Sequence, residues 1–318
     1  MKIFLTGSSG ALGSDTRLCL GGAGFEVAAF DSHSLDITDK KSVWAAVKEA
    51  RPEVIINCAA YTRVDLAETE AESALAVNRD GVENLAKAAA KVDAAVIHVS
   101  TDYVFDGKKS SPYTEGDETN PLCVYGKTKL AGEEALRQYP KHLIIRSSWL
   151  YGAAPRGNNF VKTILRLAAE KDVIRVVYDQ TGCPTWTKDL AGVIVLAAKA
   201  LGEGGAPGSG MPFGIYHYSN EGVASWYDFA MAIIEEAWQY TPPFKVQEVI
   251  PILSHEYPLP AKRPAYSVMC KDKIKKAPGP QRAGDLKIPY WRASLKKMLA
   301  EFYGKTPAGG ARAGGARA

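Results

Sequence analysis

The sequence lacks the features that mark membrane, disulfide-rich and metal-dependent proteins. It has no run of about 18 or more apolar residues, so we expect no membrane span. Its five cysteines lie far apart without a CxxC pair, which argues against a disulfide framework and against a zinc site. The five histidines form no HxH or HExxH pattern, and the GxSxG elbow of α/β-hydrolases is missing.

A strong excess of one charge is also missing. The 318 residues include 39 Lys and Arg against 35 Asp and Glu, a net charge of +4 that is too mild to indicate a nucleic-acid partner. The opening residues, MKIFLTGSSGALGS, do not resemble a secretory signal, because glycines interrupt the short apolar stretch at once. We therefore expect a cytoplasmic protein of one or two domains that binds neither nucleic acid nor membrane.

Predicted strands and helices alternate through the first half of the chain. Short apolar runs that suit buried parallel strands are followed by segments whose apolar residues return at helical spacing. The expected strands are 2–7, 25–31, 53–60, 94–101 and 142–152, and the expected helices are 12–20, 38–52, 72–92 and 124–139. This alternation predicts an α/β fold with a Rossmann-like, doubly wound parallel sheet and helices on both faces.

The pattern is looser after residue 152. We expect helices over 156–171, 187–201 and 226–240, and strands over 173–180, 215–220 and 244–252. The final Gly-Ala-Arg repeats, 304–318, are of low complexity and predict a disordered tail.

Three glycines lie in the first expected turn between a strand and a helix. Gly7, Gly10 and Gly13 are spaced GxxGxxG. A helix N-terminus offers N–H groups and a partial positive charge to a phosphate, and glycines let the backbone approach a pyrophosphate closely. Such turns also serve packing alone, but the position in the first βα turn favours dinucleotide binding.

Asp31 ends the second expected strand. A carboxylate at this position commonly holds the adenosine ribose hydroxyls and repels a 2′-phosphate, which favours NADH. His33 lies nearby and is compatible with a phosphate. The sequence therefore leaves NADH and NADPH both open.

A tyrosine and a lysine are spaced as neighbours on one helix face. Tyr125 and Lys129 are four residues apart, so an ammonium group can lie near the phenol and lower its pKa for proton transfer. A surface lysine beside a half-buried tyrosine is the structural alternative. Thr101 ends the fourth expected strand and Asp102 follows it, at the edge where parallel sheets bind ligands, although a hydroxyl there can also cap a turn.

A series of motifs resembles one family. In order, the chain contains GSSGALG, NCAAYTRVDLAE, VNRDGVENLA, HVSTDYVFDG, YGKTKLAGE, RSSWLYG, GNNFVKT, DQTGCPT and RPAYS. These motifs are similar to those of the dTDP-4-dehydrorhamnose reductase family, within the extended short-chain dehydrogenases/reductases. The resemblance covers about residues 1–300. It implies a dinucleotide-binding domain over 1–152, supplemented by a strand and a helix from 172–201, and a smaller, mainly substrate-binding domain over 153–303.

The resemblance also implies an activity and a set of site residues. The activity is NADH- or NADPH-dependent reduction of the 4-keto group of dTDP-4-dehydro-L-rhamnose to dTDP-L-rhamnose. Tyr125 would donate the proton, Lys129 would lower the pKa of Tyr125 and hold the nicotinamide ribose, and Thr101 would hydrogen-bond the sugar carbonyl. The implied cofactor contacts are Gly7, Gly10, Ala11, Leu12, Gly13, Asp31, Asp36, Ile37, Ala60, Tyr61, Thr62, Val99, Tyr125 and Lys129. The implied substrate contacts are Thr101, Asp102, Trp149 and Arg263, the last because a guanidinium suits a diphosphate.

The sequence departs from the family at one point. Some members are Mg²⁺-dependent dimers bridged by clustered glutamates. The corresponding residues here are Asp15 and Lys188, and a lysine at a ligand position argues against a Mg²⁺ site, while a homodimer stays open. Two alternatives remain: a reductase or epimerase of another nucleotide sugar, and a non-catalytic regulatory subunit of the same fold. The presence of Thr101, Tyr125 and Lys129 favours the enzyme.

Overall fold

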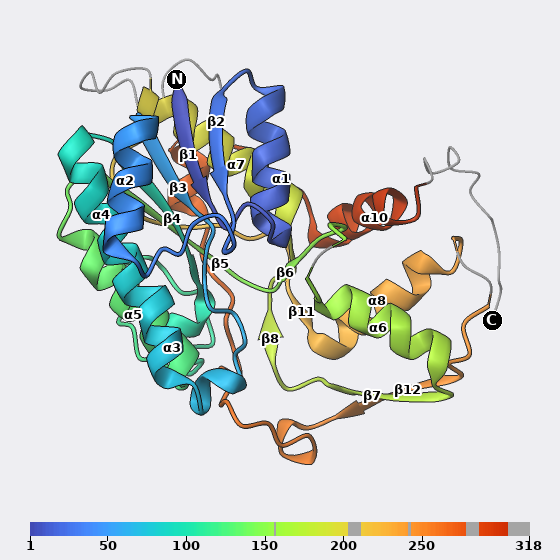
Figure 1. Cartoon of the computed structure of the whole chain (residues 1–318). Coiled ribbons are helices and arrows are strands. Elements are labelled where there is room, and N and C mark those ends of the chain that lie inside the picture. Colours follow the sequence, from blue (N-terminus) through green and yellow to red (C-terminus); the bar gives the residue numbers. More distant parts are fainter. Residues whose placement is uncertain (156, 203–210, 241–242, 278–285, 305–318) are drawn as a thin grey trace.

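A six-stranded parallel sheet forms the centre of the protein (Figure 1). The computed structural model describes residues 1–155, 157–202, 211–240, 243–277 and 286–304. The strand order is β10-β5-β4-β3-β1-β2, and all neighbouring strands are parallel. The strands are β1 (Lys2–Thr6), β2 (Glu26–Phe30), β3 (Val54–Asn57), β4 (Ala95–Thr101), β5 (His142–Ser147) and β10 (Gly214–His217). The predicted Rossmann-like, doubly wound α/β fold is confirmed.

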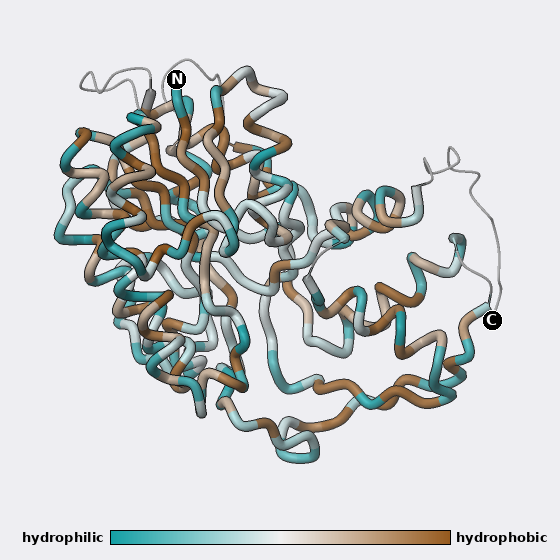
Figure 2. The backbone as a smooth tube through the Cα atoms, viewed as in Figure 1, coloured by the Kyte–Doolittle hydropathy of each residue, from teal (hydrophilic) through white to brown (hydrophobic). Residues whose placement is uncertain are grey.

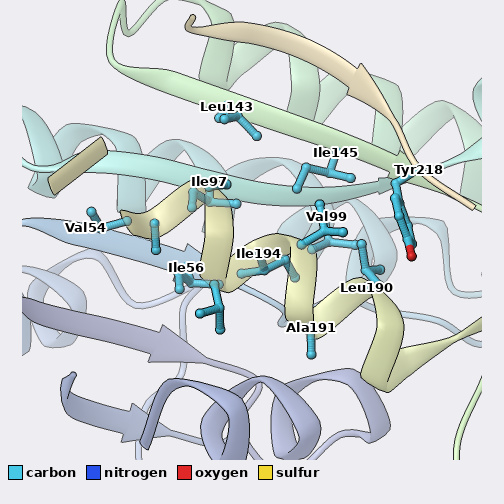
Figure 3. Packing of buried hydrophobic residues seen from close by; sticks show 14 of the residues in the cluster. Val54, Ile56, Ile97, Val99, Leu143, Ile145, Leu190, Ala191, Ile194 and Tyr218 are labelled. Atoms are coloured by element: carbon cyan, nitrogen blue, oxygen red, sulfur yellow. The ribbon is translucent and has the colours of Figure 1, made fainter. Parts of the chain in front are cut away.

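Helices cover both faces of this sheet, because side chains alternate between the two faces along each strand. On one face, α1 (Ala11–Gly22) and α7 (Thr187–Gly202) pack together over β1, β3, β4 and β5. The opposite face is covered by α2 (Lys40–Ala50), α4 (Gly81–Val92) and α5 (Val124–Arg137). Figure 3 shows the hydrophobic cluster between the sheet and the first of these layers, in which strand residues such as Ile56 and Ile97 pack with Leu190 and Ile194 of α7. Hydrophobic residues accordingly concentrate in the sheet strands (Figure 2).

The predicted helix over 72–92 is present as one continuous helical run from 71 to 92, whose regular α-helical geometry is interrupted by a wider turn. The chain forms α3 (Ala71–Leu75), then a wider helical turn η2 (Ala76–Asp80), and then α4. Gly81 at the start of α4 packs directly against the side chain of Ile37, where a Cβ would overlap it. The interruption places Asn78 toward the loop after β3, where it makes hydrogen bonds described below.

The predicted strand 142–152 is wrong as a single strand. β5 ends at Ser147, and Trp149 has a φ of 49°, a left-handed conformation that an extended strand cannot contain. β6 (Leu150–Tyr151) then pairs with β9 (Thr185–Trp186) outside the central sheet. The chain thus turns away from the sheet directly after β5.

The expected strand within 172–201 also differs from the structure. β7 (Val173–Val177) pairs with β12 (Glu248–Ile252) in a separate two-stranded sheet, and β10 takes the sixth place in the central sheet. The expected helix is present as α7, which packs against α1. Because β7 is exposed on alternate residues, it suits the edge pair with β12 better than a sheet covered on both faces.

A second hydrophobic cluster lies beside the central sheet, at the right in Figure 1. It involves α6 (Phe160–Glu170), α8 (Trp226–Ala237) and α10 (Trp291–Phe302). Two further strands, β8 (Thr181–Gly182) and β11 (Ala224–Ser225), pair antiparallel. The remaining elements are η1 (Leu66–Glu68), η3 (Asp102–Val104), η4 (Ser254–Glu256) and α9 (Asp272–Lys276). The predicted tail lies outside the described residues from 305 onward, and within the described ranges no helix is long and apolar enough to cross a membrane.

Candidate active site

The candidate site lies at the carboxyl ends of the central strands, where the chain order reverses around β1. β2 lies on one side of β1 and β3 lies on the other, and ligands of open parallel sheets bind at such a switch point. The glycine-rich turn follows β1, Thr101 ends β4, and Tyr125 and Lys129 lie on α5. The fold therefore brings the predicted residues of these segments to one edge of the sheet.

The glycine-rich turn requires its glycines. Gly7 has a φ of +68°, and a Cβ there would lie 2.6 Å from the backbone nitrogen of Ala59, after β3. A Cβ at Gly13 would overlap the carbonyl oxygen of Gly7. Gly10 is the N-cap of α1, and among the described residues no side chain caps this end of the helix. The amides of the first turn, which include Ala11 and Leu12, thus lie at a helix N-terminus that can take an anion.

The predicted adenosine contacts lie in the connection between β2 and α2. Asp31 Oδ1 accepts hydrogen bonds from the backbone N–H groups of His33 and Ser34, both at 3.1 Å, and the bonds from Ser34 lower the pKa of Asp31. Asp36 is exposed, and its carboxylate accepts from the backbone N–H of Thr38 at 2.9 Å. Ile37 is buried against Gly81. In this structure the carboxylates of Asp31 and Asp36 both accept hydrogen bonds from backbone N–H groups of the loop in which they lie.

The segment after β3 is held by one asparagine. Asn78 Oδ1 accepts from the backbone N–H of Tyr61 at 2.9 Å, and its Nδ2 donates to the Tyr61 carbonyl at 3.1 Å. The same Nδ2 donates to Thr128 Oγ1 on α5 at 3.0 Å. Asn78 thereby fixes the backbone on which Ala60 and Thr62 lie, next to the helix that carries Tyr125. Sequence reasoning missed Asn78, because only the fold brings η2 to this loop.

Thr101 and Tyr125 are coupled at the end of β4. Burial raises the pKa of the Tyr125 phenol above its ordinary value, and the nearby Thr101 side chain opposes this rise. Thr101 Oγ1 is buried, donates to Asp102 Oδ1 at 3.1 Å and accepts from the Tyr103 backbone N–H at 3.2 Å. The rings of Tyr103 and Tyr125 meet edge to face, 5.5 Å apart between centroids. The phenol is therefore buried and packed against Tyr103, and its raised pKa keeps it protonated at neutral pH.

Lys129 is buried behind this tyrosine and faces β4. Its Nζ donates to the carbonyl of Val99 at 2.8 Å and lies 3.3 Å from Nε2 of His98. Burial lowers the pKa of Lys129 to about 8, and the charge of Glu133 acts in the opposite direction. The groups that shift the pKa of Tyr125 are Thr101, Asp102 and Cys123 together with burial, so the implied effect of Lys129 on the phenol stays a prediction.

Asp102 is the most unusual carboxylate of the site. Its side chain is 2% exposed, and its Oδ2 has no hydrogen-bond partner among the residues that the structure describes. Burial raises the pKa of Asp102 to about 6. A buried polar atom without a partner is costly, and at a strand end it is often completed by a ligand.

The two remaining predicted substrate residues have defined partners. The indole of Trp149 stacks on Trp226 with ring centroids 3.5 Å apart, and a Cβ at Gly182 would overlap the Trp149 ring. Arg263 makes a two-pronged ion pair with Asp65, at 3.0 and 2.8 Å. In this structure the guanidinium of Arg263 therefore links its segment to the loop after β3.

Lys188 places a positively charged side chain at a position where a magnesium site would need a ligand. The Lys188 ammonium pairs with Glu301 at 2.9 Å, and Asp15 accepts a hydrogen bond from the Thr187 hydroxyl at 2.5 Å. Within the described residues, no group of three His, Cys, Asp or Glu side chains is arranged to hold a metal ion.

A buried ion pair beneath α5 was also missed by sequence reasoning. Arg146 on β5 binds Glu133 on α5 with an Nη2–Oε2 distance of 2.7 Å, and the Ser100 hydroxyl donates to Glu133 Oε1 at 2.5 Å. Glu133 lies four residues after Lys129, on the same helix face. The spacing YxxxKxxxE in the sequence could therefore have indicated that Glu133 lies close to the site.

A comparison with known protein families shows to which family this chain belongs. The family model described as RmlD substrate binding domain matches residues 1–303. The chain belongs to this family. It is 44% identical over 305 residues to the dTDP-4-dehydrorhamnose reductase of Aggregatibacter actinomycetemcomitans, which covers 94% of this chain and 98% of that protein.

Solved structures of the family agree with this relationship. The crystal structure of a dTDP-4-dehydrorhamnose reductase from Clostridium acetobutylicum is 40% identical, with a TM-score of 0.84 over 95% of this chain and 99% of that chain. The Bacillus anthracis dTDP-4-dehydrorhamnose reductase in complex with NADP is 37% identical, with a TM-score of 0.83 over 94% and 99%. The resemblance inferred from the motifs is thus confirmed.

Proposed function

We propose that this protein is a dTDP-4-dehydrorhamnose reductase, which reduces the 4-keto group of dTDP-4-dehydro-L-rhamnose to dTDP-L-rhamnose with NADPH or NADH. The observation that carries the proposal is the match of nearly the whole chain to proteins of that name, combined with Thr101, Tyr125 and Lys129 at one edge of the sheet. A regulatory subunit without turnover would not need a buried lysine and a buried phenol at this place.

The residues of the glycine-rich turn fit a dinucleotide. Gly7 and Gly13 allow the tight backbone packing of this turn, and the uncapped N-terminus of α1 suits the pyrophosphate. When bound, the nicotinamide cofactor supplies the hydride. Asp31, Asp36 and Ile37 would flank the adenosine, and Ala60, Tyr61, Thr62 and Val99 would line the path to the nicotinamide. The complex of the B. anthracis relative with NADP supports a nicotinamide cofactor.

Tyr125 would act as the proton donor. A ketone that accepts hydride becomes an alkoxide, and the phenol of Tyr125 transfers its proton to that oxygen. Thr101 lies close enough to the phenol to lower its pKa, so its hydroxyl is also within reach of a carbonyl oxygen that the phenol contacts. The raised pKa of Tyr125 keeps the phenol protonated before the reaction, as a donor requires.

The substrate contacts remain a proposal. Asp102 offers a buried carboxylate oxygen without a partner, which a sugar hydroxyl would satisfy. Trp149 presents an indole held in place by Trp226. Arg263 is already paired with the carboxylate of Asp65. To bind the diphosphate, its guanidinium would contact both anions at once or leave Asp65, and a guanidinium binds carboxylates and phosphates well.

The proposed function is tested by turnover. The full chain is mixed with dTDP-4-dehydro-L-rhamnose and either NADPH or NADH, and the absorbance of the reduced nicotinamide is followed. Loss of this absorbance that depends on both the enzyme and the sugar is expected. If a folded protein that binds cofactor shows no turnover with either form, the reductase proposal fails.

A further inference from the structure

Three helices from distant parts of the chain meet around one lysine. Lys188 lies in the first turn of α7, Asp15 lies on α1, and Glu301 lies near the end of α10. Residues of α1 and α7 belong to the hydrophobic cluster on the central sheet, whereas α10 belongs to the second cluster. Lys188 therefore lies between helices of the two clusters.

The ammonium group of Lys188 has a carboxylate on each side. Its Nζ pairs with Glu301 Oε2 at 2.9 Å, and the adjacent Thr187 donates its hydroxyl to Asp15 Oδ2 at 2.5 Å. The hydrogen bond with Glu301 raises the pKa of Lys188, so this side chain is charged at neutral pH. Burial raises the pKa of Asp15, and the charge of Lys188 opposes that rise while the charge of Glu301 adds to it.

Cys19 provides a second view of the same place. It lies one helical turn after Asp15 on α1. Burial raises the pKa of its thiol, and the charges of Asp15, Lys188 and Glu301 all act on it. The three charged side chains therefore lie within electrostatic reach of one point on α1, and one cation serves two carboxylates from different helices.

This donor set does not fit a divalent ion. The resemblance to the family implies Mg²⁺ at these positions in some members, but Mg²⁺ takes oxygen ligands and an ammonium group has no lone pair to give. The positive charge of Lys188 would also repel the ion. Asp15 is 6% exposed and already accepts from Thr187, and Glu301 is already paired.

We propose that the Lys188 ammonium is a built-in cation that takes the place of a divalent ion: it balances Asp15 and Glu301 and links α7 and α1 to α10, so that this junction neither binds nor needs Mg²⁺. This role of Lys188 goes beyond the proposed function, because it concerns how the two hydrophobic clusters are joined.

A charge reversal at Lys188 exposes the role most clearly. Lys188→Glu turns one cation and two anions into three anions around the same point, which is the kind of ligand set that a divalent ion prefers. The Lys188 side chain is 44% exposed, so this substitution does not disturb a packed core. Lys188→Gln is the matched control, because it removes the cation without adding a third carboxylate.

The first test measures ion binding directly in the full chain. Mn²⁺ is the probe, because it takes the same oxygen ligands as Mg²⁺ and its free ion gives an electron paramagnetic resonance signal that is lost on binding. We expect Lys188→Glu to bind Mn²⁺ at least about tenfold more tightly than wild type or Lys188→Gln. Equal binding by Lys188→Glu and Lys188→Gln contradicts the proposal, as does tight binding by wild type that Asp15→Asn abolishes.

The position of the new ion is checked by a double variant. Asp15→Asn in the Lys188→Glu background removes one of the three carboxylates but keeps an oxygen that can accept from the Thr187 hydroxyl. The gain in Mn²⁺ affinity should then disappear. A gain that survives Asp15→Asn places the ion elsewhere and overturns the proposed junction.

The second test follows thermal unfolding with MgCl₂ or with EDTA, at an ionic strength matched with NaCl. The midpoint of wild type should be the same in both solutions. The midpoint of Lys188→Glu should be lower in EDTA and should rise by about 2 °C or more with saturating Mg²⁺. A saturable rise with Mg²⁺ in wild type contradicts the proposal.

Lys141→Glu is the control for a charge reversal as such. It reverses the lysine of the exposed Lys141–Asp93 pair, on the central sheet domain and away from α10. Its midpoint should not respond to Mg²⁺. A rise equal to that of Lys188→Glu would show that any reversed surface lysine produces the effect, which overturns the special place of Lys188.

Neither measurement uses the sugar or the nicotinamide. A protein without reductase activity can still show the predicted response to Mn²⁺ and Mg²⁺, and an active reductase can lack it. The failure of this proposal and the failure of the proposed function are therefore distinguishable.

Discussion

Arg146 and Glu133 form an ion pair that is almost fully enclosed beneath the lysine of the candidate site, with side chains 3% and 1% exposed. The pair joins β5 to α5, and Glu133 also accepts from Ser100 on β4. Three elements that carry the site are thus linked through one carboxylate.

Removing that carboxylate should be costly. In Glu133→Gln the guanidinium of Arg146 remains buried without a counter-charge, and we expect the free energy of unfolding to fall by about 3 kcal/mol. Urea denaturation measures this loss. The control is Glu170→Gln, in the exposed Arg166–Glu170 pair of α6, where the change should stay within about 0.5 kcal/mol. Similar small losses in both variants would show that the buried pair contributes no more than a surface pair.

The glycine-rich turn predicts a sharp difference between two glycines of the same region. In Gly13→Ala the new methyl group would overlap the Gly7 carbonyl, so we expect a loss of roughly 1–3 kcal/mol in stability and weaker cofactor binding. Gly21→Ala on α1 meets no atom within 4 Å and should stabilise the helix by roughly 0.5–1 kcal/mol. Thermal unfolding and cofactor titration check both variants, and tight cofactor binding by Gly13→Ala would contradict the account of the turn.

The proton-donor role of Tyr125 predicts a loss confined to catalysis. Tyr125→Phe keeps the ring against Tyr103 but removes the acidic proton, so kcat should fall about 10²–10⁴-fold while the cofactor Kd is unchanged. Tyr139→Phe is the control just beyond the C-terminal end of α5, because its hydroxyl donates to the carbonyl of Ala94, at 2.7 Å. A fully active Tyr125→Phe enzyme would assign the proton to another group.

Asp102 predicts an unusual dependence of stability on pH. Its pKa is raised from 3.8 to about 6 in the folded protein, so the folded state binds this proton more tightly than the unfolded state. The resulting stabilisation is present at acidic pH and is lost as the pH rises through about 6. Asp102→Asn lacks this titration.

The measurement is urea unfolding of wild type and Asp102→Asn over a pH series. Relative to wild type, the variant should gain roughly 2 kcal/mol between about pH 4 and about pH 7. Two parallel stability curves would mean that Asp102 titrates normally in the folded protein.

Much of the fold was accessible from the sequence because the signals are local. The apolar run that ends at Gly7 and the helical spacing after Leu12 depend on adjacent residues, as does the i, i+4 spacing of Tyr125 and Lys129. These patterns were sufficient to predict the parallel sheet and the placement of the glycine turn near the tyrosine helix.

The features that could not be predicted depend on contacts between distant segments. The left-handed turn at Trp149 is accommodated by stacking on Trp226, which lies in another part of the chain. β7 leaves the central sheet because β12 pairs with it. The contacts of buried His98 with Asn57 and Lys129 depend on the register of β3 with β4, which no local pattern specifies.

The proposed reduction requires that hydride from the nicotinamide reaches C4 of the sugar. The most direct measurement incubates the full chain with dTDP-4-dehydro-L-rhamnose and NADPH that carries deuterium at the transferable position, and then reads the product by NMR. We expect dTDP-L-rhamnose with deuterium at C4. Unchanged keto-sugar, or a product with deuterium at any other carbon, would contradict the proposed reduction.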